Sequence, residues 1–334
     1  MERMRSKDEG GSVTWFVVGV VVIACSSWAG KSVSAQSYPN KPIRLIVASA
    51  AGGGTDLAAR IVGQRLSAVL GQQAIIDNRA GAAGNIAADI AAKSVADGYT
   101  LVMVSASHAI NASLYRKLSY DPVKDFAPIT QVTGSAYVFA TSLGLPAKSL
   151  AEFVALARAR KGKLAYASSG NGQAGHLAME LLKTLAGFDA VHVPYKGGGP
   201  AMMELIAGQV DAFISSPPAA VPQVKAGKVR ALAVTSLKRS DLLPDVPTIA
   251  ESGFPQYEVS GWNGLLAPAG TPAYVTSRLH REIAAMLKLA EVKERMVANG
   301  LDPGGTTPGQ FAALIKSEIL KWEKVVKLSS ASAD

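Results

Sequence analysis

Residues 42–56 read PIRLIVASAAGGGTD, and this stretch decides the fold. An apolar, partly β-branched run ends at three consecutive glycines, Gly52 to Gly54, and a helical pattern begins at Thr55. From there, apolar residues recur at spacings of three and four; they are Leu57, Ile61, Val62, Leu66, Val69 and Leu70. The stretch therefore predicts a buried strand, a tight turn and the N-terminus of a helix.

This turn has two interpretations. A helix N-terminus presents unpaired N–H groups, and the helix dipole adds partial positive charge there. Glycines let a ligand approach the backbone closely, so the turn is suited to an anion even without Arg or Lys. The alternative is a structural connection between strand and helix with nothing bound. The stretch alone favours neither interpretation.

The same alternation of strand and helix continues to about residue 235. A chain of 334 residues, 49% of them hydrophobic, can bury a large core and suggests two domains. The alternation predicts βαβ units and parallel sheets, with ligands bound beyond the carboxyl ends of the strands. We expect strands at 43–48, 74–76, 100–104, 136–140, 163–167, 190–193, 212–214 and 229–234. We expect helices at 55–70, 84–95, 150–160, 175–185, 200–207 and 219–224, and then a mostly helical final third with helices at 273–287, 291–297 and 308–326.

Two further glycine-rich turns follow strands and open helices. They lie at 168–175 (SSGNGQAG) and at 197–199 (GGG). Three such turns in two separate blocks suggest two lobes that face each other across a cleft. Ser107 follows another predicted strand, where a small hydroxyl can either orient a ligand or cap a helix.

Several kinds of catalytic site are excluded. Residues 170–175 match G-x-G-x-x-G, but no carboxylate ends the next strand, as a dinucleotide site requires. No glycine turn continues into the G-K-[ST] of a P-loop, and no G-x-S-x-G elbow is present. The four histidines have no metal-ligand spacing. The sequence therefore favours a binding protein, without metal or cofactor, over an enzyme; His176, at the start of a helix, is either a ligand contact or a capping residue.

Charge and the N-terminus indicate where the chain works. The formal net charge is +9, but the basic residues are scattered, so small acids are better expected partners than nucleic acids. A charged start and an apolar segment at 15–24 predict a signal peptide over residues 1–35, cleaved after Ala35. A lipobox-like sequence before Cys25 offers a competing lipoprotein site. Both routes predict a periplasmic protein, and the single cysteine excludes an internal disulfide.

Many short blocks in fixed order resemble the Bug family, the extracytoplasmic solute receptors of tripartite tricarboxylate transporters. The resemblance covers residues 38 to 327. Its blocks are YPNKPI at 38–43, AGGGTD at 51–56, DNRAGAAGN at 77–85, ADGYT at 96–100, SSGNG at 168–172, VPYKGGGPA at 193–201, PDVPT at 244–248 and GWNGLLAP at 261–268. Departures are small, such as Ala51 where the family often has proline.

The resemblance implies a periplasmic-binding-protein fold of the two-crossover type (type II), with a helical C-terminal segment packed on the first lobe. The first lobe would comprise residues 36–139 and 237–334 and the second 140–236. The lobes would close on a small carboxylate held largely by backbone and small polar groups. The implied contacts are Gly53, Gly54, Thr55, Asp56 and Ser107 on one side and Ser168, Ser169 and Gly170 on the other; we add His176 and Tyr195 to the expected ligand-binding set.

The expected function is capture of a small carboxylate by a monomeric receptor, which delivers it to the membrane subunits of the transporter. Two alternatives remain. A receptor of this kind can feed a sensor kinase instead of a transporter. Less favoured is an α/β hydrolase, which would need a serine beside a base, for example Ser169 with His176.

Overall fold

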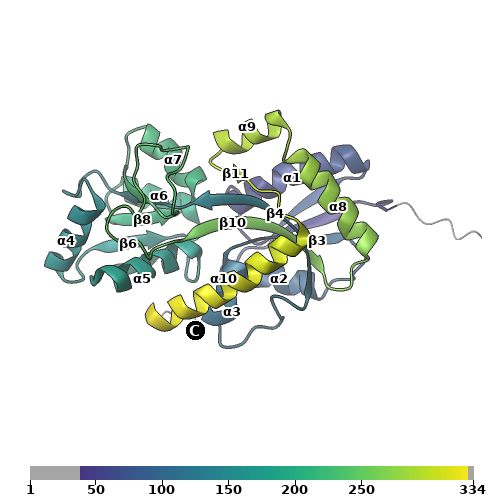
Figure 1. The fold of residues 1–334 in the computed structure, drawn as a ribbon, viewed down its shortest axis with the longest axis horizontal. Helices are drawn as coiled ribbons and strands as arrows, with labels where there is room; N and C mark the ends of the chain where they lie inside the picture. Colours follow the sequence, from purple (N-terminus) through teal and green to yellow (C-terminus); the bar gives the residue numbers. More distant parts are fainter. Residues whose placement is uncertain (1–37, 330–334) are drawn as a thin grey trace, which may run out of the picture. The chain divides into compact units, whose positions relative to one another are not determined.

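The computed structural model describes residues 38–329. The expected signal peptide, its cleavage site after Ala35 and the lipobox cysteine Cys25 lie outside the described residues. From Pro39 onward the chain is one compact unit. This unit contains two β-sheets, each flanked by helices (Figure 1).

The first sheet has six strands in the order β11-β4-β10-β3-β1-β2. The strand of the opening stretch, β1, lies between β3 and β2 and is almost completely buried, as its apolar run predicts. The bounds are β1 Ile43–Val47, β2 Ala74–Asn78, β3 Thr100–Ser105, β4 Phe126–Ala136, β10 Ser260–Pro268 and β11 Asp302–Pro303.

The second sheet has five strands in the order β7-β6-β8-β5-β9. It is built from one continuous part of the chain, with bounds β5 Val138–Thr141, β6 Ala165–Ser168, β7 Val191–Pro194, β8 Ala212–Ser215 and β9 Arg230–Val234.

Strand direction departs from the expected parallel sheets. The pairs of β1 with β2 and β3, and of β6 with β7 and β8, are parallel. In contrast, β10 runs antiparallel to both β3 and β4, and β5 runs antiparallel to β8 and β9. The prediction of wholly parallel sheets is therefore wrong, because the chain crosses between the sheets on strands that return in the opposite direction.

The chain passes from one sheet to the other beside Tyr137 and Thr235. Tyr137 separates β4 from β5, so the single strand expected at 136–140 is two strands in different sheets. The N–H of Tyr137 donates to Thr235 Oγ1 at 2.8 Å, and the N–H of Thr235 donates to the Tyr137 carbonyl at 3.0 Å. Thr235 Oγ1 in turn donates to the carbonyl of Val259, just before β10. The two connections between the sheets are thus tied together by hydrogen bonds.

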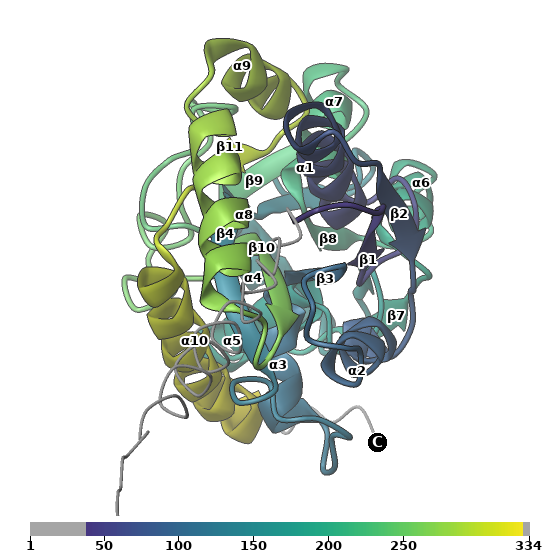
Figure 2. The ribbon, with the colours of Figure 1, turned by 90° about the vertical axis from the view of Figure 1, so that its right-hand side faces the viewer.

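Helices cover both faces of the first sheet (Figure 2). α1 and α8 contact each other on one face, and α2, α3 and α10 lie on the other. The bounds are α1 Gly54–Leu70, α2 Asn85–Ala92, α3 Ser107–Leu114, α8 Ala273–Met286, α9 Ala290–Ala298 and α10 Pro308–Ser329. Around the second sheet lie α4 Leu150–Arg160, α5 Ala174–Ala186, α6 Gly198–Ile206 and α7 Pro217–Lys225.

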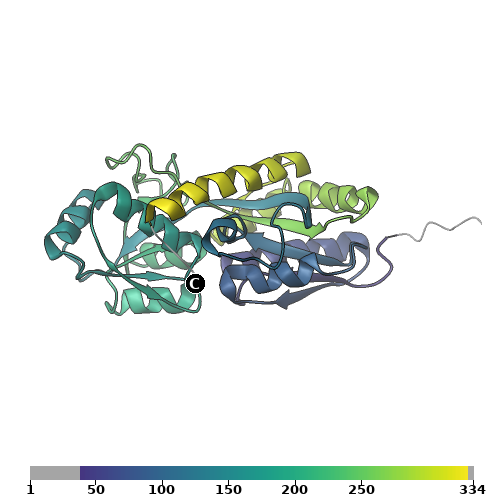
Figure 3. The same ribbon diagram turned by 90° about the horizontal axis from the view of Figure 1, so that it is seen from below.

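The last helix, α10, packs against β4 and α3 of the first sheet, and it also reaches α5 beside the second (Figure 3). Its apolar side chains Phe311 and Trp322 are completely buried. Gly264 of β10 makes room for this packing, because a Cβ there would lie only 2.0 Å from Cζ of Phe311. The C-terminal helix therefore packs on the first sheet while contacting a helix beside the second.

Candidate functional site

Neighbouring parallel strands present their carboxyl ends at the same edge of a sheet. The loops that follow β1 and β3 are therefore neighbours in the first sheet, and the loops that follow β6 and β8 are neighbours in the second. The opening stretch forms the first of these loops. Gly53 has extended backbone (φ −81°, ψ 167°), and α1 begins behind it without a side-chain cap. α5 likewise begins without one, as do α2, α3 and α6 to α9, whereas Ser149 caps α4. Uncapped N–H groups of this kind can bind an anion.

Asp56, an expected ligand contact, is fully engaged within the first lobe. Its Oδ2 accepts from the N–H of Gly52 at 2.9 Å and from Arg60 Nε at 2.9 Å. Its Oδ1 accepts from Asn78 Nδ2 at 2.9 Å. Burial alone would raise the pKa of Asp56, but these hydrogen bonds outweigh burial and hold the pKa below its ordinary value. Asp56 shapes the glycine loop.

The hydroxyl of Thr55 also points inward. Thr55 Oγ1 donates to Asn263 Oδ1 at 2.7 Å, and Asn263 Nδ2 donates to Thr133 Oγ1 at 2.8 Å, all three side chains being buried. A break in the β4–β10 register beside Asn263 lets its side chain reach α1. The Thr55 hydroxyl is therefore engaged inside the protein, and Gly53 and Gly54 carry only backbone groups.

Ser168, at the end of β6, is completely buried and holds the second glycine loop. Its Oγ lies 2.6 Å from His192 Nε2 and accepts from the N–H of Gly170 at 3.1 Å. The carbonyl of Ser169 accepts from the N–H of Gly197, and the N–H of Tyr195 donates to the carbonyl of Ser168. The loops after β6 and β7 are thus joined, with the Ser169 and Tyr195 side chains half-buried.

His176 accepts a hydrogen bond at Nδ1 from the N–H of Gly172 at 3.3 Å. Its ring stacks on His192, with ring centroids 4.0 Å apart, and His192 stacks on Tyr166 at 4.9 Å. Burial lowers the pKa of His176 to about 4, and the charge of Lys183 acts in the same direction. Burial, and next the neighbouring His176, lower the pKa of His192 to about 4. Both rings are neutral near pH 7.

The two sheets' loops meet on both sides of the cleft. On one side Ser107 Oγ donates to Gln173 Oε1 at 3.0 Å, and a Cβ on Gly172 would lie 2.4 Å from Leu114 Cδ2. On the other side a Cβ on Gly54 would lie 3.7 Å from Cγ of Pro218, at the start of α7. Each glycine loop therefore packs against a helix that flanks the opposite sheet.

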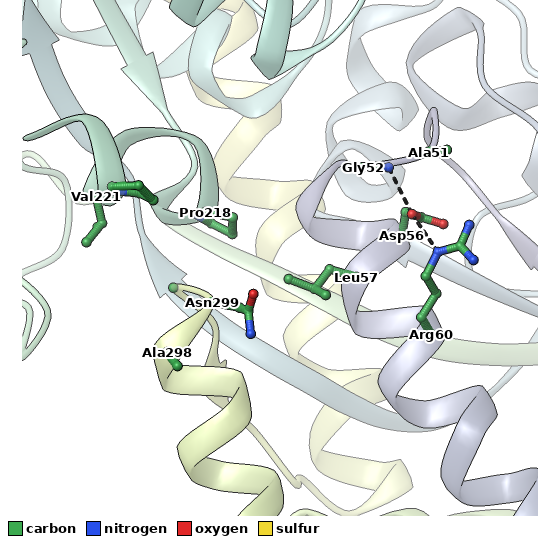
Figure 4. A pocket seen from close by; sticks show the side chains of 11 residues that line it. Ala51, Gly52, Asp56, Leu57, Arg60, Pro218, Val221, Ala298 and Asn299 are labelled. Atoms are coloured by element: carbon green, nitrogen blue, oxygen red, sulfur yellow. Dashed lines mark hydrogen bonds and ion pairs between the residues drawn. The ribbon is translucent and has the colours of Figure 1, made fainter. Parts of the chain in front are cut away.

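A cavity of about 530 Å³ opens where α1 meets α7 and the end of α9 (Figure 4). Of the expected ligand-binding residues, Asp56 lines this cavity, and the ligand contacts of all ten stay predictions. The walls from α7 and α9 could not be predicted from sequence, because only the fold brings them to α1. The lining residues are Ala51, Gly52, Asp56, Leu57, Arg60, Pro218, Val221, Pro222, Ala298, Asn299 and Gly300.

The geometry bears on metal binding and on hydrolysis. Within residues 38–329, no three His, Cys, Asp or Glu side chains gather where they could hold a metal ion. The serine that contacts a histidine is Ser168, whose hydroxyl is buried, and the Nδ1 of His176 is occupied by Gly172. A hydrolase needs an accessible nucleophile beside its base.

In the described part of the chain, every helix is too short or too polar to cross a bilayer.

Two sheets joined by crossing strands, with glycine loops that meet between them, define a periplasmic binding protein. The sequence profile described as "Tripartite tricarboxylate transporter family receptor" (TctC) matches residues 58–330. The chain belongs to this family, whose members are periplasmic solute receptors. Protein BugT of Bordetella pertussis is 38% identical over 94% of this chain and 97% of its own. The resemblance to the Bug family is thereby confirmed.

Solved structures agree with this assignment. One is titled "R. palustris Rpa4515 with adipate"; it is 39% identical, covers 88% of this chain and 99% of its own, and has a TM-score of 0.85. Another is MatC from Rhodopseudomonas palustris with bound malate, 33% identical over 86% of this chain and 100% of its own, with a TM-score of 0.81. The expected two-lobed α/β fold is confirmed.

Proposed function

We propose that this chain captures a small carboxylate between its two sheets and delivers it to the membrane subunits of a tripartite tricarboxylate transporter. The observation that carries the proposal is the pair of uncapped helix N-termini, α1 and α5, that follow glycine loops on opposite sides of the cleft. Two of the structural relatives hold dicarboxylates, adipate and malate, which fits an anion held by backbone N–H groups.

The ligand contacts proposed are the backbone of Gly53, Gly54 and Thr55 on one side and of Ser169 and Gly170 on the other. Ser107 and Tyr195 supply hydroxyls. The side chains of Asp56, Ser168 and His176 act behind this layer, because their polar atoms hold the loops. In such a site, the partial positive charges of helix N-termini stabilise the negative charge of the ligand's carboxylate, and no fixed cation is needed.

The two sheets form the cores of two lobes, residues 36–139 with 237–334 and residues 140–236, in a monomeric receptor. The hydrogen-bonded crossing at Tyr137, Thr235 and Val259 is where the lobes would rotate. A ligand favours the closed arrangement only by contacting both lobes. The first 35 residues act as the signal peptide that brings the chain to the periplasm.

The test is a thermal-shift screen of residues 36–334 against carboxylic acids, with adipate and malate included, followed by calorimetry on each acid that stabilises the chain. The decisive variant is Gly54→Pro. Proline suits the first position of a helix, and the extended Gly53 is compatible with a following proline, so the fold should persist. The variant removes one N–H that the ligand would use.

Gly54→Ala is the matched control, because alanine keeps the N–H and its Cβ would meet only Pro218 and Leu301 at ordinary contact distances. We expect the proline variant to lose roughly tenfold or more in affinity, about the worth of one charge-assisted hydrogen bond. The alanine variant should bind within a few-fold of the unchanged chain. Equal affinities in the two variants would contradict the proposed site, and a screen without any binding acid would contradict the function.

A further inference from the structure

Two histidines hold the loop of residues 168–172 from behind. His192, on β7, contacts the hydroxyl of Ser168 at the loop's first residue, and His176, on α5, accepts the N–H of Gly172 at its last. Residues in between include Ser169 and Gly170, which the proposed function places against the ligand. The two ring nitrogens therefore control the shape of a loop that they do not belong to.

The hydrogen-bond partners of Ser168 bear on the tautomer of His192, and the Gly170 carbonyl favours a protonated Nε2. A serine hydroxyl has one proton to donate and two lone pairs. Ser168 Oγ accepts from the N–H of Gly170 and lies 3.1 Å from the carbonyl of the same residue, which can only accept. If the hydroxyl donates to that carbonyl, the 2.6 Å contact is an Nε2–H of His192 donating to Ser168. The hydroxyl's one proton and two lone pairs are then all used, by Gly170 and His192.

His176 has the complementary requirement. Its Nδ1 must be unprotonated, because it accepts from Gly172. The planes of the two imidazoles are 10° apart, and Tyr166 continues the stack at 18° from His192. Side chains packed face to face in this way hold one another in place. A proton on His176 Nδ1 would put a donor against the N–H of Gly172 and break the contact.

The charged groups near the stack are engaged elsewhere. Glu180, on α5, lies 2.9 Å from Lys183 Nζ and also accepts from the Tyr166 hydroxyl at 2.5 Å. Asp189, in the turn after α5, lies 3.2 Å from Lys183 Nζ. The lysine thus offsets both acids, and no hydrogen bond from either acid to an imidazole is present among residues 38–329. A positive charge on either ring would be poorly compensated.

We propose that His176 and His192 are positioning residues for ligand capture: as neutral, stacked rings they hold the Ser168–Gly172 loop in its binding shape, and protonation of the pair releases it. The consequence for affinity rests on the proposed function, whereas the effect on the loop does not. Acid would then weaken ligand binding at a pH where the fold persists.

The loop is tested first in the ligand-free chain by amide hydrogen exchange at Gly170 and Gly172, followed by NMR. His192→Gln keeps an N–H donor at the place of Nε2, and His192→Phe keeps a stacked ring without the donor. We expect the phenylalanine variant to exchange roughly tenfold faster at Gly170, and the glutamine variant to stay near the unchanged chain. Equal exchange in both variants would overturn the proposal.

A second pair of variants tests the role of His176. Asn keeps an acceptor at the place of Nδ1, so His176→Asn should preserve the protection of Gly172, while His176→Phe should lose it. Nitrogen-15 spectra of the imidazoles must also show Nε2–H tautomers for both rings at pH 7; an Nδ1–H on His176 would overturn the proposal.

Affinity is then compared between the unchanged chain and the His176→Asn, His192→Gln double variant, by calorimetry at pH 7.5 and pH 4.0 with the acid that the screen identifies. The unchanged chain should lose more affinity on acidification than the double variant, a comparison that cancels protonation of the acid itself. An equal loss in both would overturn the proposal. If no acid binds, the proposed function fails, and the exchange measurement still decides whether the histidines position the loop.

Discussion

The hydroxyl of Thr55 and the carboxamide of Asn263 lie 208 positions apart in the sequence and 2.7 Å apart in the interior. Through this contact and the next one, to Thr133, the start of α1 is fixed to β10 and β4, the strands that lead to the crossing between the sheets. The position of the glycine loop therefore depends on a residue of the last third of the chain.

Removal of this link should destabilise the protein. Asn263→Ala leaves the hydroxyls of Thr55 and Thr133 buried without their partner, which costs about 1–3 kcal/mol in the free energy of unfolding. Urea unfolding measures the loss. The control is Asn171→Ala at an exposed position, where a change within about 0.5 kcal/mol is expected. Equal stabilities of the two variants would show that the network contributes nothing.

Gly264 should tolerate no side chain. Gly264→Ala places a Cβ 2.0 Å from the ring of the buried Phe311, so α10 must shift, and overpacking of this kind costs about 1–3 kcal/mol. Gly309→Ala, on the same helix α10, meets no atom within 4 Å and should be neutral or slightly stabilising. Thermal unfolding compares the two, and a smaller residue at Phe311 should partly restore the Gly264 variant.

Gly300 should be required for the contact between α9 and α7. A Cβ there would lie 2.8 Å from the backbone nitrogen of Pro218 and 2.9 Å from the carbonyl carbon of Pro217, and backbone atoms cannot turn aside. Gly300→Ala should therefore separate the two sheets' loops, which small-angle scattering would detect as a larger radius of gyration.

Gly187→Ala is the control for this change, because Gly187 has a similar backbone (φ +61° against +76°) with open space around it. Both variants carry the strain of a positive φ, about 1 kcal/mol, but only the first creates a clash. An unchanged radius in the Gly300 variant would argue against a close contact at this point.

The stability of the fold should fall in mild acid. Burial lowers the pKa of His108 to about 4, as it does for His176 and His192. Below a pH of about 6.5 these histidines take up protons in the unfolded chain but stay neutral in the folded chain. The stabilisation is thus complete above pH 6.5 and declines as the pH falls toward 4.

Urea midpoints at pH 7.5, 6, 5 and 4.5 measure this decline. The His176→Asn, His192→Gln double variant should show a shallower decline, since it lacks two of the three histidines whose pKa is lowered. A slope identical to that of the unchanged chain would mean that other groups take up the protons.

Much of the fold could be predicted because the signal is local. The opening stretch predicted a strand at 43–48 and a helix at 55–70, and the structure has Ile43–Val47 and Gly54–Leu70. The strand β10 escaped prediction because Ser260–Pro268 is buried on both faces, so it shows no alternation, and it contains two glycines. The strand β4 was not predicted either, because it contains Pro128 and Gly134, residue types that are typical of loops.

The candidate site was predictable as loops but not as side chains. Glycine turns after strands identify the loops from sequence alone. The roles of Asp56 and Ser168 depend on Asn78 and His192, residues 22 and 24 positions away, whose placement follows from strand register. Short polar residues beside a glycine turn look alike in sequence whether they face a ligand or hold the turn.

The last helix also decides how a solute can reach the site. Since α10 contacts α3 beside the first sheet and α5 beside the second, separation of the sheets on that side would disrupt an apolar contact. On the opposite side Arg60 and Asn299 line a cavity, and there α7 meets the start of α1 and the residues that follow α9. We therefore expect an asymmetric entrance, through which a solute arrives past an arginine and is sealed in by the proline-led end of α7.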